Sequence, residues 1–431
     1  MTSKQILQEA LNHRQGSKIP VDFGGSSVTG IHVFTVEKLR AYYGFPWKPV
    51  KVIEPYQMLG EVENDLVKAM GIDVLPLAGR STILGTVNER WREFKTFWGQ
   101  TALVSADFGP CYDGNGDLLS FPAGDISVAA SAKMPKSGYF FDAIERETPP
   151  FDDQNPNVED NLEEFGYISD IDLDYFNTLA TQLKTTGKGV LASFGGTALG
   201  DIALVPGMAL KHPKGIRGIA EWYMSTLTRR EYIMEVFERQ TEIAIENLKK
   251  IHALVGNVPD VVFTCGTDFG TQDSVFCDAA TFAYLYKPYY KKVNDWIHLN
   301  TGWKTFKHSC GAVFPLIGEF IDAGFDIVNP VQINADGMDS QKLKDTYGNQ
   351  IVFWGGGIDT QKVLPYGTPE QMRKHVLHQC EVLGKNGGFV FNSVHNVQAN
   401  VPIENLIAAI DAVRQFNGKT TAAEARQKQP T

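Results

Sequence analysis

Eight short apolar runs alternate with longer stretches of helical spacing along the chain. The apolar runs cover residues 19–25, 73–77, 189–196, 260–268, 304–311, 326–332, 351–359 and 388–395. Apolar residues recur at helical spacing in most of the intervals, at 54–70, 216–255, 279–300, 313–323 and 369–383. Eight strands with helices between them predict a (β/α)8 barrel, and an open, doubly wound sheet is the alternative that periodicity alone leaves open.

Residues 80–165 interrupt this alternation with shorter, extended patterns and turn-rich segments. The pattern over 81–104 is typical of β-hairpins, and Gly114 and Gly116 favour a tight turn. We interpret the region as a β-rich insertion within one barrel domain of residues 1–418. Residues 419–431 carry no apolar face, and we expect this tail to be disordered.

Composition and charge exclude several classes of protein. The chain of 431 residues has a formal net charge of −10 and no block of Lys and Arg, which argues against binding to nucleic acids or anionic membranes. It has no apolar stretch of about 18 residues and no signal-peptide core, so we expect a cytoplasmic protein without a membrane span. Its five cysteines are too few and too scattered for a disulfide framework, and we expect reduced thiols.

A histidine and a cysteine two positions apart, His308 and Cys310, are the most informative pair in the sequence. Side chains at i and i+2 of a strand project from the same face, and an imidazole with a thiolate suits zinc. His395 closes another apolar run, so neighbouring strands would bring three ligands together and leave a fourth position open for chemistry. The alternative is a buried, hydrogen-bonded histidine beside an inert cysteine, and Cys265 at another strand end is an alternative ligand.

Polar residues gather where the predicted strands end, which is the active-site face of such barrels. They include Asp22, Asp268, Gln272, His308, Cys310, Asn329, Gln332, Asp359, Asn392 and His395. A carboxylate at 268 could orient or protonate a substrate, but it could equally cap a helix or a turn. No nucleophile elbow, P-loop or dinucleotide fingerprint stands out, so the sequence gives little support to hydrolase, NTPase or NAD-dependent functions.

Several of these strand ends resemble the uroporphyrinogen decarboxylase superfamily, particularly its corrinoid-dependent methyltransferases. The most distinctive segments are His308-Ser309-Cys310-Gly311 and residues 323–332, 338–339, 353–361 and 401–406. Two departures stand out. The decarboxylases carry an arginine-rich signature after the first strand, whereas residues 23–30 contain no arginine. The coenzyme M methyltransferases have a third cysteine ligand near the last strand, where this chain has His395.

The resemblance implies a zinc-dependent methyltransferase on a (β/α)8 barrel, with zinc at His308, Cys310 and His395. A methyl group would move between a small O-methyl donor, preferably a methoxylated aromatic, and the cobalt of a separate corrinoid protein. The cobalamin would be carried by that partner, because this chain has no D-x-H-x-x-G segment.

In this hypothesis, Asp268 and His395 are the catalytic candidates. The residues expected to bind the substrate are Gln272, Asn329, Gln332, Asp359, Phe23 and Trp354. A metal-free decarboxylase or lyase that uses His395 and Asp268 for proton transfer is the first alternative. A non-catalytic binding protein on the same fold is the second. The sequence is compatible with a homo-oligomer and does not decide the oligomeric state.

Overall fold

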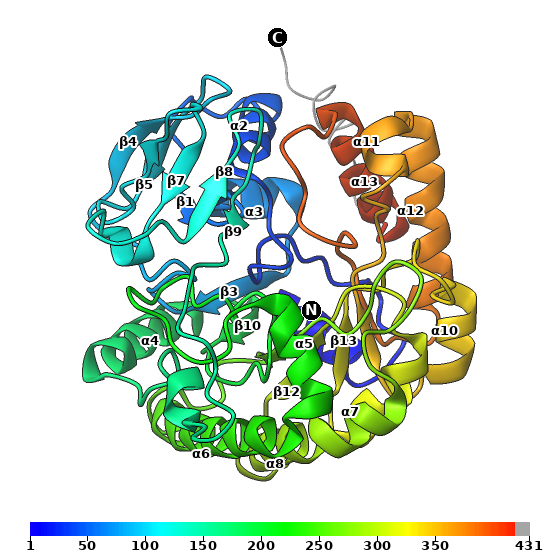
Figure 1. Ribbon diagram of the computed structural model, residues 1–431. Coiled ribbons are helices and arrows are strands. Elements are labelled where there is room, and N and C mark those ends of the chain that lie inside the picture. Colours follow the sequence, from blue (N-terminus) through cyan, green and yellow to red (C-terminus); the bar gives the residue numbers. More distant parts are fainter. Residues whose placement is uncertain (419–431) are drawn as a thin grey trace.

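A curved sheet of seven parallel strands forms the centre of the computed structural model, which describes residues 1–418 (Figure 1). The strands are β3 (Val74–Ala78), β10 (Gly189–Ser193), β11 (Val261–Cys265), β12 (Lys304–His308), β13 (Ile327–Asn329), β14 (Val352–Trp354) and β15 (Phe389–Val390). Their spatial order follows the chain, and each pair of neighbours is parallel. Seven of the eight predicted runs are therefore strands.

The first predicted run closes the sheet into a barrel. Val21 forms a parallel bridge with Phe391, and the Phe391 N–H donates to the carbonyl of Pro20 (2.8 Å). On the other side, the Asp73 N–H donates to the carbonyl of Val21 (2.7 Å). Residues 20–22 thus lie between β15 and β3. The predicted (β/α)8 barrel is confirmed, and the open sheet is not.

Helices surround this barrel (Figure 1). They are α1 (Ser3–Leu11), α2 (Val33–Tyr42), α3 (Asn64–Met70), α4 (Asp170–Leu183), α5 (Ile219–Thr228), α6 (Arg230–Val255), α7 (Ala279–Leu285), α8 (Lys287–Asn300), α9 (Ile317–Asp322), α10 (Ser340–Tyr347), α11 (Val363–Tyr366), α12 (Pro369–Gly384) and α13 (Ile403–Phe416). None of the described helices is both long and apolar enough to cross a bilayer.

Two predicted helices are wrong in their extent, and a third, 279–300, is divided at Tyr286 into α7 and α8. The stretch 54–70 begins as a hairpin of β1 (Val52–Glu54) and β2 (Leu59–Gly60), because the Glu54 carboxylate accepts the N–H groups of Tyr56 and Gln57 and turns the chain. The stretch 216–255 is two helices, since Arg229 leaves helical geometry (φ −127°, ψ 42°) between α5 and α6.

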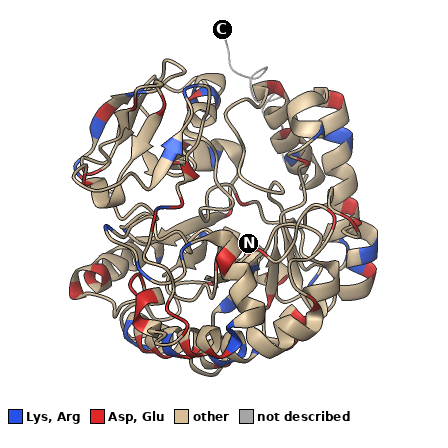
Figure 2. Ribbon diagram, viewed as in Figure 1, with Lys and Arg blue, Asp and Glu red and all other residues tan. Residues whose placement is uncertain are grey.

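The predicted β-rich insertion is present as two antiparallel sheets in a lobe beside the barrel (Figure 1). Its strands are β4 (Arg92–Lys95), β5 (Thr101–Val104), β6 (Cys111–Tyr112), β7 (Leu118–Ser120), β8 (Ala132–Met134) and β9 (Asp142–Ala143). Basic and acidic segments are interspersed over the outer helices in the view of Figure 2, where no face is coloured blue alone. The expected disordered tail, 419–431, lies outside the described residues.

The inside of the barrel is filled by alternate residues of the strands. Val74, Leu191, Val261, Phe306, Ile327, Val352, Trp354 and Val390 form one buried cluster with Leu7, Ala10 and Leu11 of α1. Helix α1 therefore closes one end of the barrel. Gly189 permits this contact, because a Cβ there would collide with the side chain of Leu7. The opposite end, where the strands finish, holds the polar side chains.

Asp22 fastens the closing segment from within the barrel wall. Its fully buried carboxylate accepts the Trp354 indole N–H (2.9 Å) and the Gly25 N–H (2.8 Å), and its carbonyl accepts the Asn392 amide (2.6 Å). Burial raises the pKa of Asp22 to about 6, although these hydrogen bonds oppose the shift. Between the ordinary pKa of 3.8 and 6, the native protein therefore holds a proton that the unfolded chain releases.

We predict that the free energy of unfolding decreases as the pH rises from 4 to 7, because the buried Asp22 carboxyl must then lose its proton in the native protein. A shift of about 2 pKa units corresponds to about 3 kcal/mol. Chemical denaturation of wild type and Asp22→Asn across this range should show wild type losing up to this amount relative to the variant. Asp152→Asn, at an exposed turn, should show the same pH dependence of the free energy of unfolding as wild type. A relative gain for wild type would contradict the prediction.

Candidate metal centre

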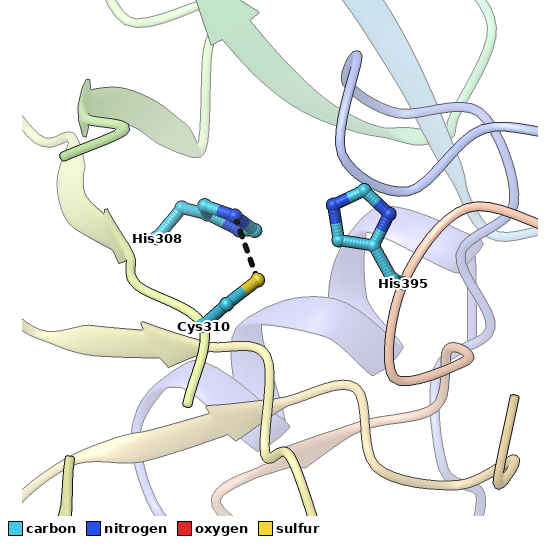
Figure 3. Close-up of side chains that lie close together, drawn as sticks. All are labelled: His308, Cys310 and His395. Atoms are coloured by element: carbon cyan, nitrogen blue, oxygen red, sulfur yellow. Dashed lines mark hydrogen bonds between the residues drawn. The ribbon is translucent and has the colours of Figure 1, made fainter. Parts of the chain in front are cut away.

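His308, Cys310 and His395 converge at the end of the barrel where the strands finish (Figure 3). Phe306, His308 and Cys310 alternate along and beyond β12, so the two polar side chains continue the inward face that begins with the buried Phe306 ring. One ligand atom from each of the three residues lies within 4.8 Å of the others, and Cys310 Sγ is 3.5 Å from His308 Nε2. The predicted convergence of these side chains is present in the structure.

Asn329 determines how the His308 ring is presented. The register of β12 and β13 sets the two residues side by side, and His308 Nδ1 lies 2.6 Å from Asn329 Oδ1. The Asn329 amide nitrogen donates to the carbonyl of Trp354 (2.9 Å), so its oxygen must face the imidazole. The proton therefore sits on Nδ1, and Nε2 is left with the lone pair that a metal ligand requires.

The backbone around Cys310 is held by side chains from neighbouring strand ends. The Cys310 N–H donates to Asp268 Oδ1 (2.6 Å), and the next N–H, of Gly311, donates to Gln332 Oε1 (2.7 Å). Gly311 has φ +94° and lies against Gly270 so closely that a Cβ on either would collide with backbone. Glycine at both positions therefore permits the close approach of the two loops beside Cys310.

His395 comes from the loop after β15 and faces His308 across the cluster, with ring centroids 5.7 Å apart (Figure 3). Ser393 Oγ donates to the His395 carbonyl (2.6 Å). The next residue, Asn396, is buried, accepts the Gly30 N–H and donates to the Ser27 carbonyl. The loop that carries His395 is thus bound to the loop that follows the first strand.

Burial sets the protonation of all three side chains. Desolvation, together with the neighbouring His308, lowers the pKa of His395 to about 4, against the attraction of Asp268. Desolvation also lowers the pKa of His308, against the attraction of Asp268. The pKa of the Cys310 thiol is raised by burial and then by Asp268. At neutral pH both imidazoles are neutral, as ligation requires, and the metal must displace a proton from the thiol.

These residues fit a zinc ion. Two nitrogens and a sulfur are a donor set typical of catalytic zinc sites, which keep the fourth position open. Zn–S and Zn–N bonds at a tetrahedral angle separate sulfur from nitrogen by about 3.6 Å, close to the 3.5 Å between Cys310 Sγ and His308 Nε2. The alternative ligand Cys265 is not in this group: it is fully buried, and its thiol contacts Tyr290 Oη (2.9 Å).

Comparisons with known proteins show which proteins the chain resembles in sequence and in fold. Residues 212–416 match the model of the uroporphyrinogen decarboxylase (URO-D) family. A segment of 80 residues, 19% of this chain, is 31% identical to a uroporphyrinogen decarboxylase from Psychromonas ingrahamii and spans 22% of that protein. A methyltransferase from Methanosarcina mazei has a similar fold over 96% of this chain and 99% of its own, with a TM-score of 0.53 and 14% sequence identity.

The strand ends from β11 onward therefore match the uroporphyrinogen decarboxylase family. This confirms the resemblance drawn from the strand ends.

The other predicted site residues lie at different depths in the barrel. Asp268 touches the cluster, since its Oδ1 is 3.7 Å from His308 Nε2. Gln332 binds the Gly311 N–H and donates to Gln272 (3.1 Å), and Gln272 donates to the carbonyl of Asn334. The Asn334 amide reaches Asp359 (3.1 Å). Gln332, Gln272 and Asp359 thus belong to one polar network along the rim, and substrate binding by them stays a prediction.

Phe23 and Trp354 lie deeper than a substrate-binding role suggests. Both are buried: Phe23 packs against Phe391, and Trp354 against Phe306. Trp354 also reaches the site indirectly, since its carbonyl accepts the amide of Asn329, which contacts the His308 ring. Substrate binding by Phe23 and Trp354 stays a prediction.

Two residues near the centre, Lys307 and Phe263, were not among those predicted from the sequence. Lys307 is fully buried on the outward face of β12, and its ammonium donates to the carbonyls of Thr267 (2.5 Å) and His308 (2.6 Å). It ties the ends of β11 and β12 together, and a lysine inside an apolar strand was the available signal. Phe263 is half-buried and stacks near His308, with centroids 6.4 Å apart. Only the alternation of β11 could have placed that ring inside.

We predict that the purified protein binds about one zinc per chain through these three side chains. His308→Ala, Cys310→Ala and His395→Ala should each weaken zinc binding at least about tenfold, because each removes one ligand of a three-ligand site. Competition with a chelator and elemental analysis would measure this. His212→Ala and Cys111→Ser, at exposed positions, are matched controls. Unchanged affinity in the three ligand variants would contradict the site.

We predict that Asn329→Ala weakens zinc binding by about 10–100-fold, although Asn329 touches no metal. Removing a hydrogen-bond partner of a ligating imidazole commonly has this effect, since the ring loses its orientation and fixed tautomer. Zinc affinity measured beside a Gln361→Ala control would test it, because Gln361 lies on the rim network away from His308. Equal affinities in wild type and Asn329→Ala would refute this role.

Proposed function

We propose that this protein is a zinc-dependent methyltransferase that moves a methyl group between a small O-methyl donor and the cobalt of a separate corrinoid protein. The observation that carries the proposal is the group of His308, Cys310 and His395 at the open end of the barrel. The methyltransferase from Methanosarcina mazei, which has this fold, supports the reaction class.

The side chains of the centre suit an O-methyl bond. A zinc ion held there would act as a Lewis acid toward the heteroatom that carries the methyl group. Asp268 fixes the Cys310 backbone and turns a partly exposed carboxylate toward the same space. Lys307 keeps the ends of β11 and β12 in register, so the thiol and the first imidazole stay together. These residues supply preorganised geometry, which the leaving of an alkoxide or phenolate requires.

An aromatic donor without several carboxylates fits the surroundings best. The half-buried Phe263 ring lies beside His308 and offers a flat apolar surface. The loop after the first strand, residues 23–30, contains no arginine that could pair with the carboxylates of a tetrapyrrole. The similarity to a uroporphyrinogen decarboxylase makes decarboxylation the second candidate, but the missing arginines count against that substrate.

The methyl acceptor would arrive on a partner. The sequence has no D-x-H-x-x-G segment for binding cobalamin, so a corrinoid protein would present its cobalt to the open end of the barrel. In this reaction the corrinoid is a substrate, and the chain described here binds the donor and holds it in line with the acceptor.

We predict that the anaerobically prepared, zinc-loaded protein methylates cob(I)alamin from methoxylated phenols, measured by the change in the corrinoid absorption spectrum. His308→Ala should lower the rate at least about 100-fold, because positioning and Lewis acidity are lost together. His212→Ala should retain the wild-type rate. Release of CO2 from a carboxylic acid by the metal-free protein, without any methylation of cobalamin, would favour the decarboxylase instead.

A further inference from the structure

A second carboxylate, Asp201, lies in the loop after β10, beside Gly266 at the end of β11. Its Oδ1 accepts the Ala203 N–H (3.0 Å), whereas its Oδ2 lies beside Gly266, where a Cβ would stand 2.7 Å from that oxygen. Glycine at 266 therefore makes room for the carboxylate. Among the described residues, the charged side chains that act on Asp201 are Asp268 and Lys307. Asp201 thus lies near Asp268, the carboxylate that approaches His308.

Tyr223 of α5 stands on the same side. Its hydroxyl is buried and has no hydrogen-bond partner among the described residues, and it feels the charges of Asp201 and Asp268. The ring stacks on Phe276, with centroids 4.9 Å apart and an interplanar angle of 21°. Buried hydroxyls in native proteins are nearly always paired, so this one requires a ligand or a water molecule.

Beside Asp201 lies a small cavity, lined mainly by apolar atoms, with room for about one water molecule. Its wall includes Asp201, Glu164, Trp222 and Gln240. The Trp222 indole N–H and Glu164 Oε2 are buried there without partners among the described residues. Trp222 and Tyr223 are neighbours on α5 and so point in different directions, one into the cavity and the other toward the carboxylates.

We propose that Asp201 is the acid that protonates the departing oxygen of the methyl donor, and that the cavity beside it returns the proton. This inference rests on the proposed methyl transfer. The cobalt(I) electron pair of the corrinoid substrate forms the new bond to the methyl carbon, and the O–CH3 bond breaks with its electron pair staying on oxygen. The Asp201 O–H bond breaks as the alcohol or phenol O–H forms, which leaves a carboxylate to be reprotonated through Glu164.

The contacts favour Asp201 over Asp268 for this role. Asp268 Oδ1 is committed to the Cys310 N–H, and the same carboxylate lies beside His308. Asp201 Oδ2 has no such commitment. Burial raises the pKa of Asp201 to about 6, and the charge of Asp268 adds to this effect while Lys307 opposes it. Burial also raises the pKa of Glu164, against the attraction of Arg217. Both carboxyls can therefore hold a proton closer to neutral pH than ordinary carboxyls do.

The test compares donors whose leaving groups need a proton to different extents. Rates of cob(I)alamin methylation would be measured with 4-methoxyphenol, which releases a strongly basic phenolate, and with 4-nitroanisole, which releases a weakly basic one. Asp201→Asn keeps the acceptor for the Ala203 N–H but cannot donate the acid proton. It should slow the first donor by about 100-fold and the second by less than about fivefold, because general acid catalysis contributes roughly 10²–10⁴-fold where the leaving group is basic. Asp152→Asn, which caps an exposed turn in the same way, is the matched control.

An infrared titration gives a readout independent of activity. The carboxylic acid C=O band present in wild type and missing in Asp201→Asn should disappear with a midpoint near pH 6. Equal slowing of both donors, or an Asp201 that is already ionised at pH 5, would overturn the inference. If wild type methylates no corrinoid, the proposed function fails, while the titration still decides whether Asp201 holds the proton. If wild type is active and Asp201→Asn equals it on both donors, the inference alone fails.

Discussion

The alternation of side chains along β12 is the constraint on which the site depends. Phe306 points into the barrel and packs in its core, so His308 and Cys310, two and four residues later, must point the same way. A shift of one residue would bring Lys307 inside and turn both ligands toward the helices. The apolar interior therefore fixes the register, and the register delivers the imidazole and the thiol to the open end.

Burial of the three side chains shifts their pKa values, and hydrogen bonds from neighbouring residues hold them in place. The low pKa values of the two imidazoles keep their lone pairs free, whereas burial works against the thiolate of Cys310. Lys307 opposes this rise in the Cys310 pKa, and a metal cation at the centre would oppose it further, which would couple metal binding to loss of the thiol proton. Asn329 holds the His308 ring through its Nδ1, and Asp268 holds Cys310 through its backbone N–H.

Much of the fold and the centre of the site could be predicted from periodicity, because strand ends in a barrel meet on one face. The eight runs and His308, Cys310 and His395 follow from that rule. The hairpin at Val52–Gly60 was missed, since a turn built by the Glu54 carboxylate leaves no trace in the apolar spacing. Asp201 was missed for a related reason: it lies in an irregular loop, and only folding sets it beside Gly266.

The two carboxylates near the centre, Asp268 and Asp201, differ in what their oxygens bind. Asp268 Oδ1 accepts the backbone N–H of Cys310, so any change in the charge of Asp268 would also disturb the thiol that it positions. Asp201 is held by its own loop through the Ala203 N–H, so in the proposed role its second oxygen would lose and regain a proton without moving His308, Cys310 or His395. A proton that must travel during each turnover is better placed on a group that holds nothing else together. The Tyr223 hydroxyl, which has no hydrogen-bond partner among the described residues, and the cavity beside Asp201 lie on that same side of the barrel, where such a proton would pass.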